Sequence, residues 1–240
     1  MHNPDRRLPF QGLLNARDLG GYPTVDGART RWRSVLRSDD LAQLTPDGFR
    51  ELCDYGIGTV LDLRWLEEIA LNPSPLTAVG TAIRYRHVSL LTRTAAEWRE
   101  ISKGSQKEFW KCVVLERAQP QLREVLEAIA TAAEGPLLFH CVAGKDRTGL
   151  VAALLLTLAD VEPEAIAQDY AASTRLLSDA YLQRYADVDP ADVLENVRCP
   201  EAGVHNMLGF LRSQGGIRAY LRDIGLGRAT IQRLRARLRD

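Results

Sequence analysis

The sequence predicts an α/β fold in which a mostly parallel central sheet is flanked by helices on both sides. Segments with helical spacing alternate with short apolar segments along the chain, which is typical of such sheets. Two apolar segments, 57–63 and 137–140, lack the polar alternation of a half-exposed strand, so we expect them to be buried on both faces. A chain of 240 residues suits one hydrophobic core, and we predict a single domain over 1–240.

The N-terminal part of the chain predicts irregular structure followed by one helix and one strand. Turn residues dominate before residue 40, with a short strand near 32–36. Thr45 and Pro46 provide an N-cap and a first-turn proline for a helix that ends at Gly56. The apolar strand 57–63 follows directly, so this region forms one helix–strand step of the sheet.

The middle of the chain contains a second strand and a segment without any sheet pattern. Alternating residues over 83–88 predict a strand that is less fully buried. Residues 92–118 are polar with scattered aromatic side chains, and predict a helical insertion of one or two amphipathic helices. This insertion either packs on the domain or covers the functional site as a lid. Helical spacing over 122–130 then leads into the strand 137–140.

The C-terminal part predicts only helices. Residues 149–158 are almost entirely apolar, which indicates a buried central helix, since the segment is too short to span a bilayer. A helix begins at Pro163, and 176–185 predicts another. Two further helices are expected over 217–224 and 231–238.

Charge and composition argue against several classes of protein. The 31 basic residues equal the 31 acidic residues, so the whole molecule offers no bulk attraction to nucleic acid or to an anionic membrane. Residues 1–10 are polar and no segment suits stable membrane insertion, so we expect a cytoplasmic protein, or one exported without a cleavable signal. Four widely spaced cysteines without a Cys-x-x-Cys pair indicate neither a disulfide framework nor a metal site.

The segment 140–149, which we call the cysteine loop, is the most informative part of the sequence. It reads His-Cys-Val-Ala-Gly-Lys-Asp-Arg-Thr-Gly and lies between a predicted strand and a predicted helix. The helix would direct unpaired N–H groups and its positive dipole end at the loop, and small residues would let the backbone curl around a tetrahedral oxyanion. The residues whose backbone or side chain we expect to bind phosphate are Val142, Ala143, Gly144, Lys145, Asp146 and Arg147.

The side chains of the cysteine loop predict covalent chemistry on phosphate esters. A helix N-terminus and neighbouring cations stabilise a thiolate, so Cys141 is the expected nucleophile. Arg147 can hold two phosphoryl oxygens with its planar fork and remain bound to them in the transition state. Thr148 is placed to donate its hydroxyl to the sulfur, and His140 to orient the loop through a hydrogen bond to backbone.

The pattern His-Cys-x5-Arg-Thr-Gly resembles the signature of the cysteine-dependent protein tyrosine phosphatase superfamily. The form Ala-Gly-Lys-Asp-Arg-Thr-Gly is similar to bacterial tyrosine/lipid phosphatases of the mycobacterial secreted type. Other segments that resemble this group are 15–21 (with Ala16 in place of an aromatic residue), 36–39, 61–64 with Glu67 and Glu68, 169–173, and 215–216. The resemblance implies a protein tyrosine phosphatase-like fold, a phosphocysteine intermediate and no metal or organic cofactor.

The general acid has three candidates, because the sequence contains no Trp-Pro-Asp segment. The resemblance implies that Asp146 takes this role, as in relatives with Lys-Asp-Arg, although the adjoining Arg147 should lower its pKa. Asp62, at the carboxyl end of a predicted strand, is the alternative acid. Alternatively, Asp62 has no catalytic role and forms an ion pair with Arg64 that shapes the loop. Asp39 is a weaker third candidate.

Lys145 adds a second cation to the cysteine loop. If it faces the substrate, it favours substrates with additional negative charge, such as phosphoinositides; if not, it is a solvated or ion-paired lysine. We therefore expect hydrolysis of phosphotyrosine, with phosphoserine, phosphothreonine and phosphoinositide monoesters as further substrates.

Three other functions use a similar loop. A sulfurtransferase also places a cysteine in an anion-binding loop, but would not need the Arg-Thr-Gly that follows. An arsenate reductase would need resolving thiols, and the other cysteines are not obviously placed for that role. A non-catalytic phosphate-binding module would not need both the nucleophile and the arginine. The sequence leaves the natural substrate and the oligomeric state open.

Overall fold

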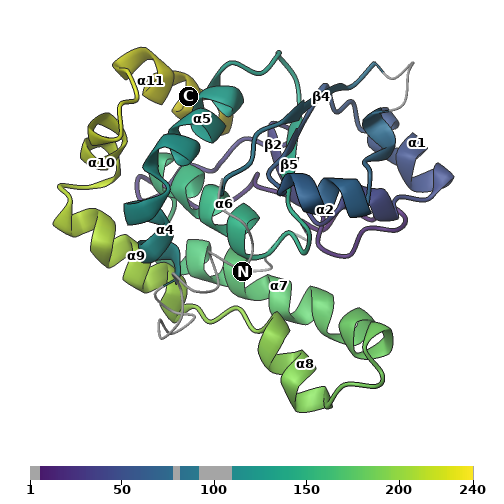
Figure 1. Ribbon diagram of the computed structural model, residues 1–240. Coiled ribbons are helices and arrows are strands. Elements are labelled where there is room, and N and C mark those ends of the chain that lie inside the picture. The colour runs from purple at the N-terminus through teal and green to yellow at the C-terminus, as the bar shows by residue number, and fades with distance from the viewer. Residues whose placement is uncertain (1–5, 78–81, 92–109, 240) are drawn as a thin grey trace.

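The computed structural model describes residues 6–77, 82–91 and 110–239, and these residues form an α/β fold (Figure 1). Their central sheet has the strand order β1-β2-β5-β3-β4, in which only β1 is antiparallel to its neighbour. The predicted mostly parallel sheet is therefore confirmed. The strands are β1 (Arg17–Asp18), β2 (Val35–Ser38), β3 (Thr59–Asp62), β4 (Arg84–His87) and β5 (Leu137–His140).

Helices lie on both sides of this sheet, as Figure 1 shows. They are α1 (Pro46–Asp54), α2 (Leu66–Leu71), α4 (Trp110–Arg117), α5 (Gln119–Ala130), α6 (Asp146–Leu158), α7 (Pro163–Arg184), α8 (Pro190–Val197), α9 (Ala202–Ser213), α10 (Ile217–Asp223) and α11 (Arg228–Leu238). Two short 3₁₀ turns cover Leu41–Gln43 and Pro75–Thr77. No helix among the described residues is long and apolar enough to cross a membrane.

Neighbouring residues of the central strands enter two different hydrophobic cores. Val60 and Leu138 belong to the smaller core, together with Leu52 of α1. Leu61 and Phe139 belong to the larger core, which helices α4 to α7 and α9 to α11 complete. Both faces of β3 and β5 are thus covered, which explains why these strands lack polar alternation.

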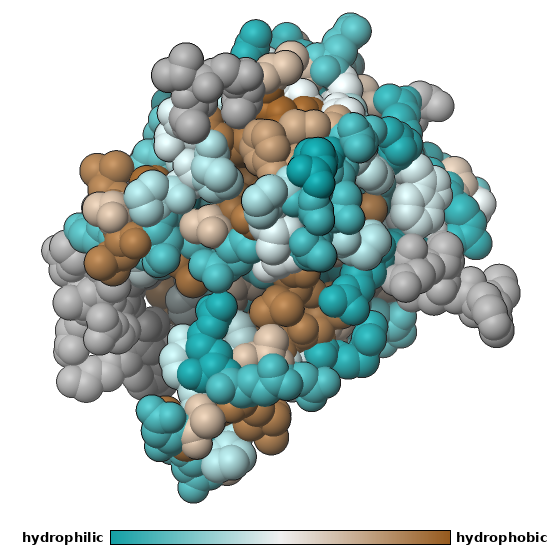
Figure 2. Space-filling view, turned by 90° about the vertical axis from the view of Figure 1, so that its right-hand side faces the viewer, coloured by the Kyte–Doolittle hydropathy of each residue, from teal (hydrophilic) through white to brown (hydrophobic). Residues whose placement is uncertain are grey.

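Apolar side chains are also found on the surface. Figure 2 shows the face that carries α1 and α2, where apolar patches alternate with polar side chains. Leu66 and Leu71 of α2 are both largely exposed. Helix α2 therefore contributes little to either core, and its place in the molecule depends on the polar contacts at its N-terminus described below.

Local capping confirms the predicted first helix. The Thr45 side chain accepts a hydrogen bond from the N–H of Gly48, and Pro46 is the first helical residue. The helix is followed by Gly56 at φ +87°, a conformation that favours glycine. Strand β3 then begins at Thr59, two residues after the predicted start.

The prediction of two helices between 163 and 185 is wrong, because α7 runs without a break from Pro163 to Arg184. Its middle contains Ser173 and Thr174, which disfavour a helix interior when they compete with the backbone. Here the Ser173 hydroxyl accepts hydrogen bonds from Arg17 and Asn15, and the Thr174 hydroxyl accepts one from the N–H of Cys199. Tertiary partners thus engage both hydroxyls and the helix continues.

The end of α7 and the following α8 project from the rest of the molecule and form what we call the arm, residues 176–197 (Figure 1). The predicted strand near 32–36 lies slightly later, at 35–38. The last turns of the predicted insertion form α4, whose Val114 and Leu115 are buried in the larger core. The proposed lid falls mainly on 92–109, which lie outside the described residues.

Candidate active site

The cysteine loop connects the carboxyl end of β5 to the start of α6, at the edge where the parallel strands end. The backbone N–H groups of residues 142–147 donate to no acceptor within the described part of the chain. Gly144 has φ +62°, and a Cβ atom there would lie 2.4 Å from the carbonyl oxygen of Ser38. Only glycine fits this position, so the loop keeps a tight curve with its donors free for an anion.

Cys141 lies at the base of this loop and is only 3% exposed. The hydroxyl of Thr148 is buried and has no hydrogen-bond partner among the described residues, so it is free to donate to the sulfur. Nδ1 of His140 lies 3.1 Å from the Cys141 carbonyl oxygen, the backbone contact that the sequence predicts. Burial is the main cause that lowers the pKa of His140, which keeps the ring neutral near pH 7.

Arg147 is held by two residues of the α2 region. Its Nη1 and Nη2 donate to the two carboxylate oxygens of Glu68 at 2.6 and 2.7 Å, and its guanidinium lies 4.5 Å from the Trp65 ring centroid. Burial opposes a charged guanidinium, but the Glu68 and Cys141 charges outweigh it and raise the pKa of Arg147. One edge of the fork is thereby fixed, and Nε remains for a phosphoryl oxygen.

Sequence reasoning missed this role of Glu68, although it recognised the segment that contains it. The same carboxylate also accepts a hydrogen bond from the N–H of Trp65 at 2.8 Å, which caps α2. A Glu three residues after an N-cap is the spacing of a capping box. That spacing is the signal from which the position of the carboxylate could have been inferred, but it does not identify Arg147 as the second partner.

Asp146 is the first residue of α6, and its side chain is 45% exposed. One carboxylate oxygen accepts a hydrogen bond from the Tyr170 hydroxyl at 2.9 Å, and the other lies 3.4 Å from Nζ of Lys145. Burial by itself would raise the pKa of Asp146, but Lys145, Lys111 and Tyr170 outweigh it and lower the pKa. The pKa of Asp146 is therefore lowered, as expected, but the cause is the two lysines and not chiefly Arg147.

Lys145 does not extend into solvent. The residue is 7% exposed, and its ammonium group donates to the backbone carbonyl of Asn196, near the end of α8. The cysteine loop is therefore connected to the arm through this lysine. A second buried lysine, Lys111 of α4, lies 3.3 Å from the Tyr170 ring centroid, and burial lowers its pKa to about 8.

Asp62 and Arg64 form a buried ion pair beneath the loop. Both Asp62 oxygens accept from Arg64 at 2.6–3.0 Å, and one also accepts from the Tyr85 hydroxyl at 2.8 Å. Arg64 in turn donates to Asp40 at 2.8 Å. Burial would raise the pKa of Asp62, but Arg64 and His140 lower it to about 2. The structure therefore contains the Asp62–Arg64 ion pair that the sequence offered as the alternative to an acid role for Asp62.

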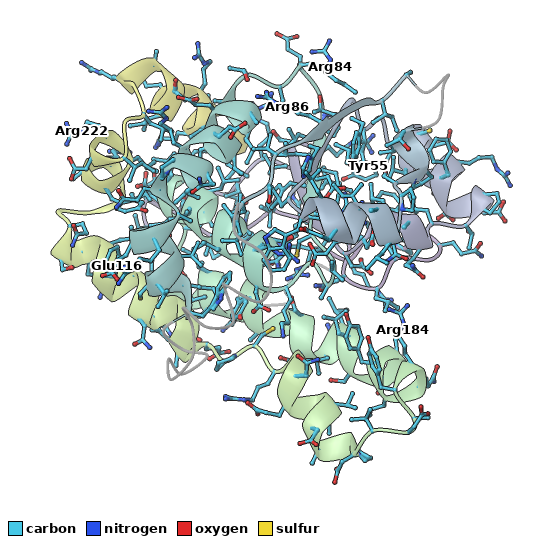
Figure 3. All side chains as sticks on the ribbon, in the orientation of Figure 1. Tyr55, Arg84, Arg86, Glu116, Arg184 and Arg222 are labelled. Carbon is cyan, nitrogen blue, oxygen red and sulfur yellow. The ribbon has the colours of Figure 1, made fainter. Side chains whose placement is uncertain are left out.

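A cavity of about 290 Å³ lies beside the loop, between the arm and the rest of the molecule. Its lining includes Val142, Asp39, Tyr181 and Arg184. Both oxygens of Asp39 accept backbone N–H hydrogen bonds at 2.9 Å, and burial raises the pKa of this carboxyl. Figure 3 shows Arg184 at the outer end of α7. The cavity thus adjoins the cysteine loop at Val142.

Comparison with known proteins identifies the family to which this chain belongs. The sequence model described as the tyrosine phosphatase family matches residues 8–240. A tyrosine-protein phosphatase of Nostoc commune is 34% identical over 218 residues, which cover 85% of this chain and 74% of that protein. The triple specificity protein phosphatase PtpB of Mycobacterium tuberculosis is 28% identical over 279 residues, covering 96% of this chain and 97% of that protein.

Among solved structures, TpbA of P. aeruginosa aligns with a TM-score of 0.37 and 17% identity, over 69% of this chain and 86% of that chain. The family match extends over nearly the whole chain and includes the cysteine loop, α2 and the arm. This chain belongs to the tyrosine phosphatase family and is a phosphatase of the protein-tyrosine-phosphatase type.

Proposed function

We propose that the protein hydrolyses phosphotyrosine through a phosphocysteine intermediate on Cys141. The observation that carries this proposal is that the N–H groups from 142 to 147 donate to no acceptor among the described residues, in a loop that starts from a buried cysteine. Arg147, fixed by Glu68, adds a charge-assisted donor at the same place. These donors suit the three equatorial oxygens of a phosphoryl group in transfer.

The proposed reaction has two displacements. In the first, the Cys141 sulfur forms a bond to phosphorus while the bond from phosphorus to the tyrosine oxygen breaks, and Asp146 gives its proton to the departing phenolate. In the second, a water molecule loses a proton to Asp146 and attacks phosphorus, and the phosphorus–sulfur bond breaks. Thr148 can then stabilise the returning thiolate with its free hydroxyl.

Asp146 is proposed as the acid in preference to Asp62 and Asp39 because its side chain is the most accessible of the three. Asp146 is half exposed at the start of α6, whereas Asp62 is fully buried with both oxygens bound to Arg64. Both oxygens of Asp39 already accept backbone N–H groups. The lowered pKa of Asp146 opposes its protonation, and a bound phosphate dianion acts in the other direction.

Phosphoserine, phosphothreonine and phosphoinositide monoesters are proposed as further substrates. The support is the similarity to PtpB, named a triple specificity protein phosphatase, over nearly all of this chain. The contacts of Lys145 with Asn196 and Asp146 speak against a direct role of this lysine in recognising a second phosphate. Arg184, exposed beside the cavity, is a better placed cation for such a group.

The three alternative functions receive less support from the site. A sulfurtransferase does not need an arginine fixed by Glu68 next to the loop. An arsenate reductase needs a resolving thiol, and the Cys199 thiol donates to the Val197 carbonyl oxygen at 3.4 Å. A non-catalytic module would not need a buried hydroxyl at Thr148 that is without a hydrogen-bond partner among the described residues.

Turnover with two aryl phosphates tests the proposal. Cys141→Ser should reduce hydrolysis of both to background while the melting temperature stays near that of the wild type. Asp146→Asn should lower kcat about 100-fold for phosphotyrosine, and much less for an aryl phosphate whose ring withdraws electrons, because its leaving group needs no proton. Undiminished phosphotyrosine turnover by Asp146→Asn, with a loss in Asp62→Asn, would transfer the acid role to Asp62.

A further inference from the structure

The carbonyl groups of the cysteine loop all point into the protein. If the N–H groups face an anion, the carbonyls must face away from it, where buried acceptors require donors. Each of the five carbonyls from 141 to 145 has one. The donors are His140 Nδ1 for Cys141, the N–H of Asp40 for Val142, Asn15 Nδ2 for Ala143 and Gly144, Arg37 Nη2 for Gly144, and the N–H of Gly149 for Lys145.

Arg37 is the only charged side chain among these donors in the described residues. Its Nη2 lies 2.6 Å from the Gly144 carbonyl oxygen and 3.4 Å from that of Lys145. The guanidinium is fully buried at the end of β2 and donates from Nη1 to Asp169 at 2.5 Å. Asp169 of α7 therefore fixes one side of the Arg37 guanidinium, and the other side contacts the two residues that precede α6.

A second guanidinium completes the buried group. Arg17 donates to Asp169 at 2.9 Å and to the side-chain oxygen of Asn15 at 2.5 Å, and Asn15 donates onward to the loop. Tyr22 donates its hydroxyl to the same Asp169 at 2.9 Å. The segments 15–21, 36–39 and 169–173, which resemble the family in sequence, thus meet behind the cysteine loop.

The formal charges of this group do not cancel. It contains two guanidinium ions, from Arg17 and Arg37, and one carboxylate, from Asp169. Burial raises the pKa of Tyr22 far above its usual range, so its hydroxyl stays neutral. Burial opposes an ionised Asp169, but the two arginines lower the pKa of that carboxyl below its usual range. Two buried guanidinium groups therefore share the single carboxylate of Asp169, while the buried Asp39 carboxyl accepts the N–H of Asn15 beside them and the Arg6 guanidinium lies over the Tyr22 ring.

We propose that Arg37 is a positioning residue of the phosphatase reaction, with an electrostatic part that a neutral donor could not supply. Its hydrogen bonds to the Gly144 and Lys145 carbonyls keep the N–H groups of the loop directed at the anion. Its buried positive charge, in direct contact with these carbonyls, stabilises the Cys141 thiolate and the bound phosphoryl dianion from behind. This inference rests on the proposed function, since it assigns Arg37 to the same site.

Alkylation of Cys141 separates this role from a merely structural one. The rate of modification by iodoacetamide, followed by mass spectrometry of the Cys141 peptide, reports the thiolate at each pH without turnover. In Arg37→Met the pH midpoint of alkylation should rise by about one unit, a tenfold loss of thiolate. The affinity for orthovanadate should fall at least tenfold, while Arg37→Lys should recover most of both.

Asp169→Asn gives a prediction of opposite sign. This variant removes the negative charge from the group, so the alkylation midpoint should move to lower pH even though the melting temperature falls. If the role were only structural, the variant would be less stable and the pH midpoint of Cys141 alkylation would not fall. The variant also keeps the inference testable if Arg37→Met fails to fold.

Arg64→Met is the matched control, because Arg64 is equally buried and paired with aspartates but donates to no carbonyl of the loop. It should lower the melting temperature and shift the alkylation midpoint by much less than Arg37→Met does, because the partners of Arg64 are Asp40, Asp62 and the Asn72 carbonyl. The inference is overturned if Arg37→Met changes only the melting temperature, or if Arg64→Met shifts the midpoint equally. Failure of the wild type to hydrolyse any aryl phosphate would instead contradict the proposed function.

Discussion

Two side chains next to the nucleophile have contacts that change their expected roles. Lys145 was expected either to face the substrate or to be ion-paired, and its partners are Asp146 and the Asn196 carbonyl. Asn196 lies 51 residues further along the chain, so no local pattern could predict the contact. Glu68 likewise meets Arg147 from 79 residues away. Residue types and spacing predicted the chemistry of the loop, but the supporting contacts depend on the tertiary fold.

Glu68→Gln tests the fixing of Arg147. The amide cannot accept both charge-assisted hydrogen bonds, so kcat/KM should fall about 10- to 100-fold, since each such bond contributes about 1.5–3 kcal/mol. Steady-state kinetics with phosphotyrosine measure the effect. Glu67→Gln, an exposed neighbour on the same helix, is the matched control and should behave as the wild type. Equal kinetics for both variants would show that Arg147 needs no such support.

Lys145→Met tests the new assignment of the lysine. Lys145 is the largest influence that lowers the pKa of Asp146, so its removal should raise that pKa. A general acid must carry its proton in the first displacement, and the basic limb of the kcat–pH profile should therefore move to higher pH. The ratio of phosphoinositide to phosphotyrosine turnover should stay constant. A fall in that ratio would restore the direct role of Lys145 in substrate selection.

At the scale of elements, the apolar strands and the capped first helix could be predicted because their signals are local. Strands β3 and β5 are buried on both faces, which their composition requires. The continuity of α7 could not be predicted, since it depends on tertiary partners for Ser173 and Thr174. The apolar segment 149–158 predicts only the later part of α6, which begins already at Asp146 and so places the acid candidate on the helix.

The ion pair of Asp62 with Arg64, at the carboxyl end of β3, gives a prediction about stability and pH. The pKa of Asp62 is lowered to about 2 in the folded protein, against about 3.9 in an unfolded chain. Its contribution is therefore fully present above pH 4 and is lost as the pH falls towards 2. The difference in unfolding free energy between the wild type and Asp62→Asn should shrink by about 2 kcal/mol over that range. Urea unfolding at several pH values measures it.

Asp54→Asn, at the exposed end of α1, is the control for this experiment and should show a constant difference from the wild type. A difference for Asp62→Asn that stays the same from pH 5 to pH 2 would contradict the assigned ion pair. If Asp62→Asn lowered kcat by more than its loss of stability explains, Asp62 would again be a candidate for the general acid.

At the scale of the whole molecule, the fold brings three separate parts of the chain to one loop. The N-terminal segment and β2 support the loop from behind, α2 fixes Arg147, and the arm binds Lys145. The zero net charge of the sequence gives no hint of this local concentration of cations. Electrostatic attraction of the substrate is thus a property of the site and not of the molecule as a whole.

Direct detection of the covalent intermediate tests the central claim. Wild-type protein mixed with a phosphotyrosine peptide is quenched in acid within one turnover, and the proteolytic fragments are measured by mass spectrometry. The account predicts a phosphoryl group on the Cys141 peptide, which disappears as turnover ends and is absent in Cys141→Ser. Turnover without any phosphorylated Cys141, or with the phosphoryl group on another residue, would contradict it.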